Sequence, residues 1–231
     1  MERYDVIVVG SGATGGWAAH ELTRAGLRVI VLEAGAASSD PSPLVDHVDH
    51  PYATPGDRPY RWVRSRVLGG RTLSWNAITL RFSERDFQPR DGAGEAWPIS
   101  YAELAPFYAI AERALRVSGR HDRLEQVPDG VFLPPRQMTE GERLFASRVE
   151  GAWPDRRVII QRGALPGPAW RSTTSTLAAA RRTRRLTVRT DAIAARLQLS
   201  RGRARGVVCV DRITGRTFEV RGAAVVLCAS T

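Results

Sequence analysis

The amino-terminal part of the sequence carries three glycines at a spacing that suits phosphate binding. Gly10, Gly12 and Gly15 follow the apolar run Val6-Ile7-Val8-Val9 and precede a helical pattern. Glycine at these places permits a tight turn, leaves room for a pyrophosphate beside the backbone and lets the helix pack closely on the strand. The helix amino terminus then offers unpaired N–H groups and the positive end of its dipole to phosphate oxygens.

A carboxylate completes this pattern. Glu33 ends a second apolar strand, predicted over 27–32, and lies 18 residues beyond Gly15. There it can accept hydrogen bonds from a ribose diol and would repel a 2′-phosphate, so NADP is disfavoured. The intervening helix is predicted to run to Ala25 and to stop at Gly26. Because strand, glycine loop, helix and acid occur in the required order, the sequence predicts a dinucleotide-binding βαβ unit, without deciding between FAD and NAD.

A second glycine motif, residues 66–76, follows a proline-rich stretch. Its paired glycines would let the backbone approach a planar or phosphorylated ligand, and Arg66 could neutralise phosphate charge. The alternative interpretation is a tight turn packed beneath Trp75. Taken alone, this motif does not separate the two interpretations.

Four segments share their residues with one known family. They are Val31-Leu32-Glu33-Ala34-Gly35, Gly69-Gly70-x-Thr72-x-x-Trp75-Asn76-x-x-x-x-Arg81, Trp97-Pro98-Ile99-Ser100-Tyr101-x-Glu103-Leu104-x-Pro106-Phe107-Tyr108 and Ala224-Val225-Val226-Leu227-Cys228-Ala229-Ser230-Thr231. In combination they resemble the glucose–methanol–choline (GMC) oxidoreductases, and look closest to the branch of pyranose oxidase and the bacterial glucoside 3-dehydrogenases. The resemblance runs over nearly the whole chain.

The resemblance implies FAD as the cofactor and distributes its contacts along the chain. Non-covalent FAD is expected, because Ser74 occupies the place where pyranose oxidase has a flavin-linked histidine. Asn76 would face the reactive edge of the isoalloxazine, and a strand near Ala194 would contact adenine through its backbone. The expected cofactor-binding residues are Gly10, Gly12, Ala13, Thr14, Gly15, Glu33, Ala34, Arg66, Gly69, Gly70, Thr72, Ser74, Asn76, Ala194, Ala229 and Ser230.

The resemblance also implies a reaction, the oxidation of a CH–OH group of a sugar or other alcohol by hydride transfer to flavin. This chemistry needs a base for the hydroxyl proton, which family members carry as a histidine in their carboxyl-terminal half. His20, His47, His50 and His121 do not match that position, so no catalytic residue is named. We therefore expect a truncated product, one half of a split enzyme completed by a second polypeptide, or a repurposed binding domain.

Composition limits the alternatives. All 34 basic residues are arginine, and the net charge is +10. The exclusive use of arginine is more typical of GC-rich codon usage than of selection for a phosphate-binding surface. Nucleic acid is not an expected partner, and the arginines at 181–185 fit a helix end. Cys209 and Cys228 lie in apolar runs and are expected to be buried thiols, with no metal site. No membrane-spanning run and no secretory signal is found, so a soluble, cytoplasmic protein is expected.

The expected fold class is α/β: a Rossmann-type FAD-binding domain over 1–231, GMC-like and incomplete at its carboxyl end, with an irregular and helical insertion at 40–150. The capping box of Ser100 and Glu103 predicts a helix start at Tyr101. Its apolar face is expected to be core, and Pro106 to kink or restart the helix. The members of that face are Leu104, Phe107, Tyr108, Ala111 and Leu115.

The remaining third of the chain is predicted to be mainly strands. Four are expected at 186–189, 193–199, 206–211 and 217–220, with a hairpin turn at Thr214-Gly215. A buried parallel strand is expected at 224–228, because that run is apolar throughout. Two other functions stay open, an NAD-binding oxidoreductase and a non-catalytic interaction subunit that keeps the fold.

Overall fold

The computed structural model describes residues 3–38, 44–45, 63–88, 94–164 and 170–229. By its internal contacts the chain forms two compact units. The first combines Met1–Trp75 with Arg171–Thr231, and the second is Asn76–Trp170. The sequence places an insertion at 40–150, whereas the contacts divide the chain after Trp75 and after Trp170.

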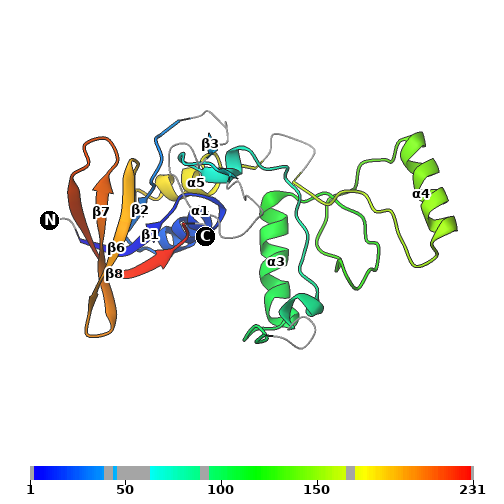
Figure 1. Cartoon of the computed structure of the whole chain (residues 1–231), viewed down its shortest axis with the longest axis horizontal. Helices are drawn as coiled ribbons and strands as arrows, with labels where there is room; N and C mark the ends of the chain where they lie inside the picture. Colours follow the sequence, from blue (N-terminus) through cyan, green and yellow to red (C-terminus); the bar gives the residue numbers. More distant parts are fainter. Residues whose placement is uncertain (1–2, 39–43, 46–62, 89–93, 165–169, 230–231) are drawn as a thin grey trace, which may run out of the picture. The chain divides into compact units, whose positions relative to one another are not determined.

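A six-stranded sheet forms the centre of the first unit. Its strands are β1 (Arg3–Val9), β2 (Val29–Leu32), β5 (Leu186–Arg189), β6 (Ala192–Ser200), β7 (Arg203–Asp211) and β8 (Thr217–Leu227). Their order is β5-β2-β1-β8-β7-β6. β5, β2, β1 and the second half of β8 are parallel, whereas β6, β7 and β8 form an antiparallel meander. Figure 1 shows β1 (blue) and β8 (red), the two ends of the chain, side by side.

Strand β1 is apolar on both faces because both faces are covered. Val6 and Val8 pack in one cluster with helices α1 (Ala13–Arg24) and α5 (Thr176–Arg182). Ile7 and Val9 pack in another cluster with buried residues of the meander. The unbroken apolar run of the sequence thus reflects a parallel strand between two layers.

Helix α1 ends where the sequence predicts. Its last helical residue is Arg24, and Gly26 takes a φ of 91° that reverses the chain. The N–H of Leu27 then donates to the carbonyl of Leu22 at 3.1 Å. This glycine-based ending satisfies carbonyls that the helix leaves unpaired, so the predicted stop at Gly26 is confirmed.

The last strand differs from the prediction. The segments 217–220 and 224–228 were expected to be separate, but β8 is continuous through Gly222. It pairs with β7 up to Arg221 and with β1 from Arg221 onward, so one extended strand serves two neighbours. A Cβ at Gly222 would lie 2.8 Å from Cγ1 of Ile7, which shows how closely the backbone approaches β1.

The expected burial of this strand is also wrong. Leu227 is 64% exposed, and Ala224 is exposed as well. A continuous apolar run is typical of a strand that is buried on both faces. It does not decide how much of each face the neighbouring elements cover.

The second unit is built from two helices and irregular segments. Its helices α3 (Tyr101–Leu115) and α4 (Glu140–Ala152) both begin with a capping box, of which the first confirms the predicted start. Helix α3 runs through Pro106 without interruption, so the predicted restart is wrong. Proline removes one helical hydrogen bond near the start, where the cap stabilises the helix.

The predicted apolar face of α3 is not a core. Phe107 is 65% exposed, and the other four members of the face are only partly buried. The buried residue of the helix is Glu112. Its carboxylate accepts two hydrogen bonds from Arg81, each 2.7 Å, and one from the N–H of Val131 at 2.8 Å. A charged pair therefore organises this part of the unit.

Four short elements complete the described structure. Strands β3 (Leu44–Val45) and β4 (Val63–Arg64) pair antiparallel, and the 3-10 turns are η1 (Gly70–Leu73) and η2 (Glu84–Phe87). Among the helices of the described residues, none combines the length and apolar character that a membrane crossing needs.

Candidate functional site

The loop between β1 and α1 presents open backbone. A Cβ built on Gly15 would lie 1.9 Å from the carbonyl oxygen of Gly10, so only glycine lets the helix start this close to the loop. The Cβ position of Gly12, in contrast, has no other described part of the chain within 4 Å. Ala13 and Thr14 are exposed in the first turn of α1, whose N–H groups have no helical acceptors. The loop thus combines N–H donors with empty space.

The second glycine motif lies against this loop. Gly69, in the left-handed region at φ 95°, donates its N–H to Oγ of Ser11 at 2.8 Å. A Cβ on Gly70 would lie 3.6 Å from Cα of Gly12. Two motifs that are 58 residues apart at Ser11 and Gly69 therefore meet on one surface.

The segment after β2 pairs with the residues just before the paired glycines of the second motif and so positions them beside the first loop. The N–H of Leu68 donates to the carbonyl of Ala36 at 2.9 Å, and Ala36 forms a parallel bridge with Val67. Gly35 makes the approach possible, since a Cβ there would lie 2.1 Å from the carbonyl of Arg66. Ala34, half-buried, is the neighbour of Gly35 in this contact. No separate role was predicted for Gly35.

Glu33 is held in place by three donors. Its side chain is buried, and one carboxylate oxygen accepts from the N–H of Ser11 at 3.1 Å and from the Ser11 hydroxyl. The other oxygen accepts from the N–H of Gly35 at 2.9 Å. A carboxylate has about four acceptor positions, so about one remains for a ligand hydroxyl.

The carboxyl end of β8 reaches the first loop. A Cβ on Gly10 would lie 2.4 Å from the carbonyl oxygen of Cys228 and 3.1 Å from Cα of Ala229. The N–H of Cys228 donates to the carbonyl of Val9 at 2.8 Å. Ala229 therefore lies beside the glycine loop, and Ser230 is outside the described residues.

Three other expected residues have different surroundings. Ala194 lies on β6, two residues after Ala192, whose N–H donates to the carbonyl of Glu33 at 2.9 Å. Ser74 is exposed after η1, with its hydroxyl 3.4 Å from that of Ser65. Asn76 belongs to the second unit, where its carbonyl accepts from the side-chain amide of Gln161 at 3.4 Å.

Three buried residues at this site were missed from the sequence. They are Ser11, Ser172 and Gly16. Ser11 lies inside the first motif, and Ser172 forms hydrogen bonds with Thr72, which was an expected site residue. Gly16 lets α5 approach, because a Cβ there would lie 2.5 Å from the hydroxyl of Thr176. The doubled glycine at 15 and 16 was the available signal, since the first motif needs only one of them.

The described cysteines and histidines lie in different surroundings. Cys209 is fully buried as expected, and burial raises the pKa of its thiol to about 11, whereas Cys228 is only half-buried. His20 lies on α1 beside Trp17, and the ring of His121 contacts the carbonyl of Gly130 at 3.0 Å. His47 and His50 are outside the described residues. Within the described ranges no group of His, Cys, Asp and Glu has a metal-binding arrangement.

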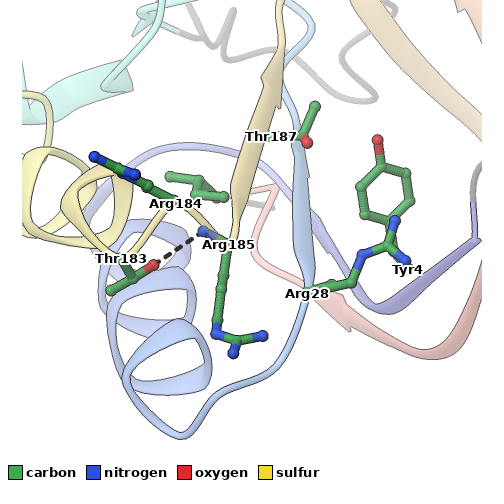
Figure 2. A pocket seen from close by; sticks show the side chains of 7 residues that line it. Tyr4, Arg28, Thr183, Arg184, Arg185 and Thr187 are labelled. Atoms are coloured by element: carbon green, nitrogen blue, oxygen red, sulfur yellow. Dashed lines mark hydrogen bonds between the residues drawn. The ribbon is translucent and has the colours of Figure 1, made fainter.

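A hollow of about 450 Å³ lies at the other end of the parallel strands. It is lined by Tyr4, Arg28, Thr183, Arg184, Arg185, Leu186 and Thr187. Figure 2 shows the three arginine side chains pointing apart, with Arg28 turned toward the ring of Tyr4. The backbone N–H of Arg185 donates to the Thr183 hydroxyl at 3.2 Å. These residues lie at or just before the starts of β1, β2 and β5, whereas the glycine loops follow strand ends, so the hollow is separate from the candidate site.

Comparison with known proteins connects this geometry to a family. Residues 5–42 match a family described as an FAD binding domain. Paromamine 6′-oxidase of Streptomyces fradiae is 36% identical over 129 residues, which cover 50% of this chain and 24% of that protein. The 2-methyl-1,2-propanediol dehydrogenase of Mycolicibacterium austroafricanum is 26% identical and matches 99% of this chain but 49% of its own length.

A solved structure shares the fold. Pyridoxine 4-oxidase from Mesorbium loti superposes with a TM-score of 0.66 at 20% identity, over 97% of this chain and 49% of that one. The chain thus spans about half or less of the length of these relatives. The expected α/β, Rossmann-type fold is confirmed. The open backbone at Gly12 and the buried acid at Glu33 both fit a dinucleotide, the chain is similar to FAD-dependent oxidoreductases of the glucose–methanol–choline type, and FAD is its cofactor.

Proposed function

We propose that the chain is the FAD-binding portion of an oxidoreductase that oxidises a CH–OH group of a sugar or other alcohol. The observation that carries this proposal is the meeting of the two glycine loops, with Gly12 open and Gly70 beside it. The relatives named for paromamine and for a propanediol support an alcohol substrate. FAD supplies the hydride acceptor when bound.

The first loop binds the pyrophosphate in this proposal. The N–H groups of Gly12, Ala13 and Thr14 donate to phosphate oxygens, and the dipole of the 12-residue helix α1 adds to their attraction. The absent side chain of Gly12 leaves the space that the phosphates need. Gly10 and Gly15 keep strand and helix close enough for both to contribute.

Glu33 orients the adenosine ribose. Because three N–H and O–H donors already hold its carboxylate, the remaining acceptor position has a set direction. A ribose hydroxyl can donate to it, and a 2′-phosphate would be repelled. This selects against NADP, in agreement with the preference expected from the sequence.

The second motif and the last strands line the rest of the cofactor. Gly69, Gly70 and Thr72 line the pyrophosphate and flavin with their backbone, and Arg66 contributes charge. Ala194 contacts adenine through its backbone, and Ala34 lies next to the ribose-binding acid. The other proposed contacts are Ser74, Asn76, Ala229 and Ser230, with FAD held non-covalently.

A base for the substrate proton is proposed to come from further polypeptide. None of the histidines is assigned this role, because none matches the position of the family's catalytic histidine. A segment equivalent to the second half of the relatives, on the same or a second polypeptide, would supply the base and the substrate pocket. A cytoplasmic location remains a prediction.

The experiment that tests the proposal is a titration of the purified full chain with FAD, followed by flavin fluorescence. We expect saturable binding of one FAD, release of the flavin on denaturation, and weaker binding of NADPH than of NADH. Substrate-dependent bleaching of the flavin is expected only after the matching carboxyl-terminal polypeptide is added. A soluble, monodisperse chain that shows no FAD binding would contradict the proposal. Saturable binding of NAD in its place would favour a nicotinamide-dependent enzyme.

A further inference from the structure

We propose that Ser172 is a positioning residue that joins the two glycine loops into one preformed cradle for FAD. The inference rests on the proposed cofactor site, and it adds a residue from a third segment of the chain. Ser172 is fully buried, so it acts on the loops and not on the cofactor directly.

Ser172 contacts both loops. Its hydroxyl donates to the carbonyl of Ser11 in the first loop at 2.8 Å. Its backbone N–H donates to the hydroxyl of Thr72 in the second loop at 3.2 Å. These partners are 161 and 100 residues away in the sequence. A single residue thus connects two segments that are otherwise distant along the chain.

The hydrogen bonds connect Ser172, Thr72, Gly69 and Ser11 in a closed circuit of residues. The Thr72 hydroxyl donates to the carbonyl of Gly69 at 2.6 Å, which leaves it only as an acceptor toward Ser172. The N–H of Gly69 donates to the Ser11 hydroxyl at 2.8 Å, and that hydroxyl donates to Glu33. Because each hydroxyl has one proton, every donor in the circuit has one assigned acceptor. A fully satisfied buried network of this kind is rigid.

Gly16 determines where Ser172 can lie. A Cβ at Gly16 would lie 2.9 Å from Cβ of Ser172 and 2.5 Å from the hydroxyl oxygen of Thr176. Any larger residue at position 16 would therefore push the segment that carries Ser172 away from α1. This accounts for the second glycine of the Gly15-Gly16 pair, which phosphate binding itself does not require.

The circuit sets the distance between the loops before FAD arrives. A Cβ on Gly70 would lie only 3.6 Å from Cα of Gly12, so the loops are at contact distance beside the open space. When the loops are already ordered in the free protein, the binding free energy is not reduced by the entropy lost in ordering them. Removing the Ser172 hydroxyl should therefore weaken FAD binding although no FAD contact is removed.

The test compares Ser172→Ala with Thr174→Ala in the full chain. Thr174 is exposed on the same segment, and its hydroxyl reaches the carbonyl of Arg171 at 3.4 Å. FAD dissociation constants are measured by fluorescence, and amide exchange of the FAD-free chain by mass spectrometry over 10–16 and 66–76. We expect about tenfold weaker binding and faster exchange in both segments for Ser172→Ala, and no more than about twofold change for Thr174→Ala.

A variant that only lowers stability separates positioning from a general structural effect. Val207→Ala removes two buried methyl groups from the meander, so it should lower the melting temperature but leave the FAD dissociation constant and the loop exchange unchanged. Thr72→Val should resemble Ser172→Ala, and the double variant should be less than additive, because both break one circuit.

Two outcomes overturn the inference alone. One is equal FAD affinity in the unaltered chain and in both hydroxyl variants. The other is a loss of affinity in Val207→Ala as large as that in Ser172→Ala, with unchanged loop exchange. Failure of the unaltered chain to bind FAD is distinct from both, since it rejects the proposed function and the inference with it.

Discussion

The two units of the chain bury polar groups of different kinds. In the first unit the buried polar groups are mainly hydroxyls with one carboxylate, and they hold backbone loops. The second unit buries Ser83 and Ser118, and in addition arginine–carboxylate pairs, Arg81 with Glu112 and Arg162 with Asp122 and Asp129. Irregular backbone is held in the first unit by hydroxyls and a carboxylate without a cationic partner among the contacts described, and in the second unit by ion pairs as well.

Arg162 shows the second strategy most clearly. Its side chain is 1% exposed and donates to the carbonyls of Val127 and Pro128 at 2.9 and 2.8 Å. It also donates to Asp129 at 2.7 Å and to Asp122 at 3.2 Å. One guanidinium therefore ties together a loop that contains no regular helix or strand.

The difference follows from what else each unit can bury. Apolar strands on both sides of β1 give the first unit a core, so its buried polar groups can serve the loops of a ligand site. Helix α4 of the second unit has no buried residue, and α3 has only Glu112. Without an apolar core at these helices, paired charges order the chain, and such pairs are costly to break because the remaining partner stays buried.

The largest effect is expected from Arg162→Met. Removing the guanidinium takes away the side-chain donor of two carbonyls and one cationic partner of Asp122 and Asp129, which keep Arg120 and two backbone N–H groups. Breaking this buried ion pair should destabilise the second unit by about 3 kcal/mol or more. Urea unfolding followed by amide exchange over 118–133 measures this. Arg156→Met is the matched control, since Arg156 is 72% exposed and lies 3.6 Å from Asp155, and it should change stability by less than about 0.5 kcal/mol. If the two variants were equally stable, the buried Arg162 ion pairs would not be what orders the second unit.

A smaller effect is expected from Gly15→Ala in the first unit. The added methyl would lie 1.9 Å from the carbonyl oxygen of Gly10, so α1 must move away from β1. Overpacking of this kind costs about 1–3 kcal/mol, which thermal unfolding can detect. Gly141→Ala in α4 is the control, because nothing lies within 4 Å and alanine favours a helix. A neutral Gly15→Ala would mean that the helix does not start as close to the loop as described.

Gly12→Ala should separate binding from stability. Its φ is −65° and its Cβ position is open, so the melting temperature should stay nearly unchanged. The methyl would occupy the space assigned to the pyrophosphate, and FAD affinity should fall about tenfold or more, equal to about 1.4 kcal/mol. Calorimetric titration with FAD is the measurement. Unchanged affinity would place the phosphates away from Gly12.

The smallest effect is a pH dependence at the start of α4. Hydrogen bonds from Arg136 and Thr139 lower the pKa of Glu142 from 4.5 to about 2. Because the pKa is lower in the folded state, the contribution is fully present above 4.5 and is lost as the pH falls toward 2. Amide exchange at 139–143 should therefore accelerate in that interval. Glu142→Gln should remove this dependence, and a dependence that persists in the variant would assign it to another group.

Several features could be read from the sequence because they depend on neighbouring residues. The capping box of Ser100 and Glu103 spans four positions, and the structure has it as predicted. The end of α1 at Gly26 requires only a residue that can adopt a left-handed backbone conformation directly after the helix. The expected association of the first glycine motif with a strand, a helix and an acid also rests on short spacings.

Burial was the weaker part of the prediction. Phe107 and Leu227 were expected inside and are 65% and 64% exposed, whereas Glu112 and Arg162 are buried. Periodicity identifies which residues share a face of a helix or strand. It carries no information on which neighbour will cover that face, or whether a charged residue elsewhere will supply a partner.

The sequence by itself determined the βαβ unit, its glycine loop and the acid at Glu33, because strand and helix periods act over a few residues. Only the tertiary structure decided that Gly70 lies beside Gly12 and that Ser172 joins their loops. The Ser172 contacts span 100 and 161 residues, and serine has no spacing rule that would link it to such distant partners. Their meeting depends on how closely α1, α5 and the two loops pack, which glycine at positions 15 and 16 permits.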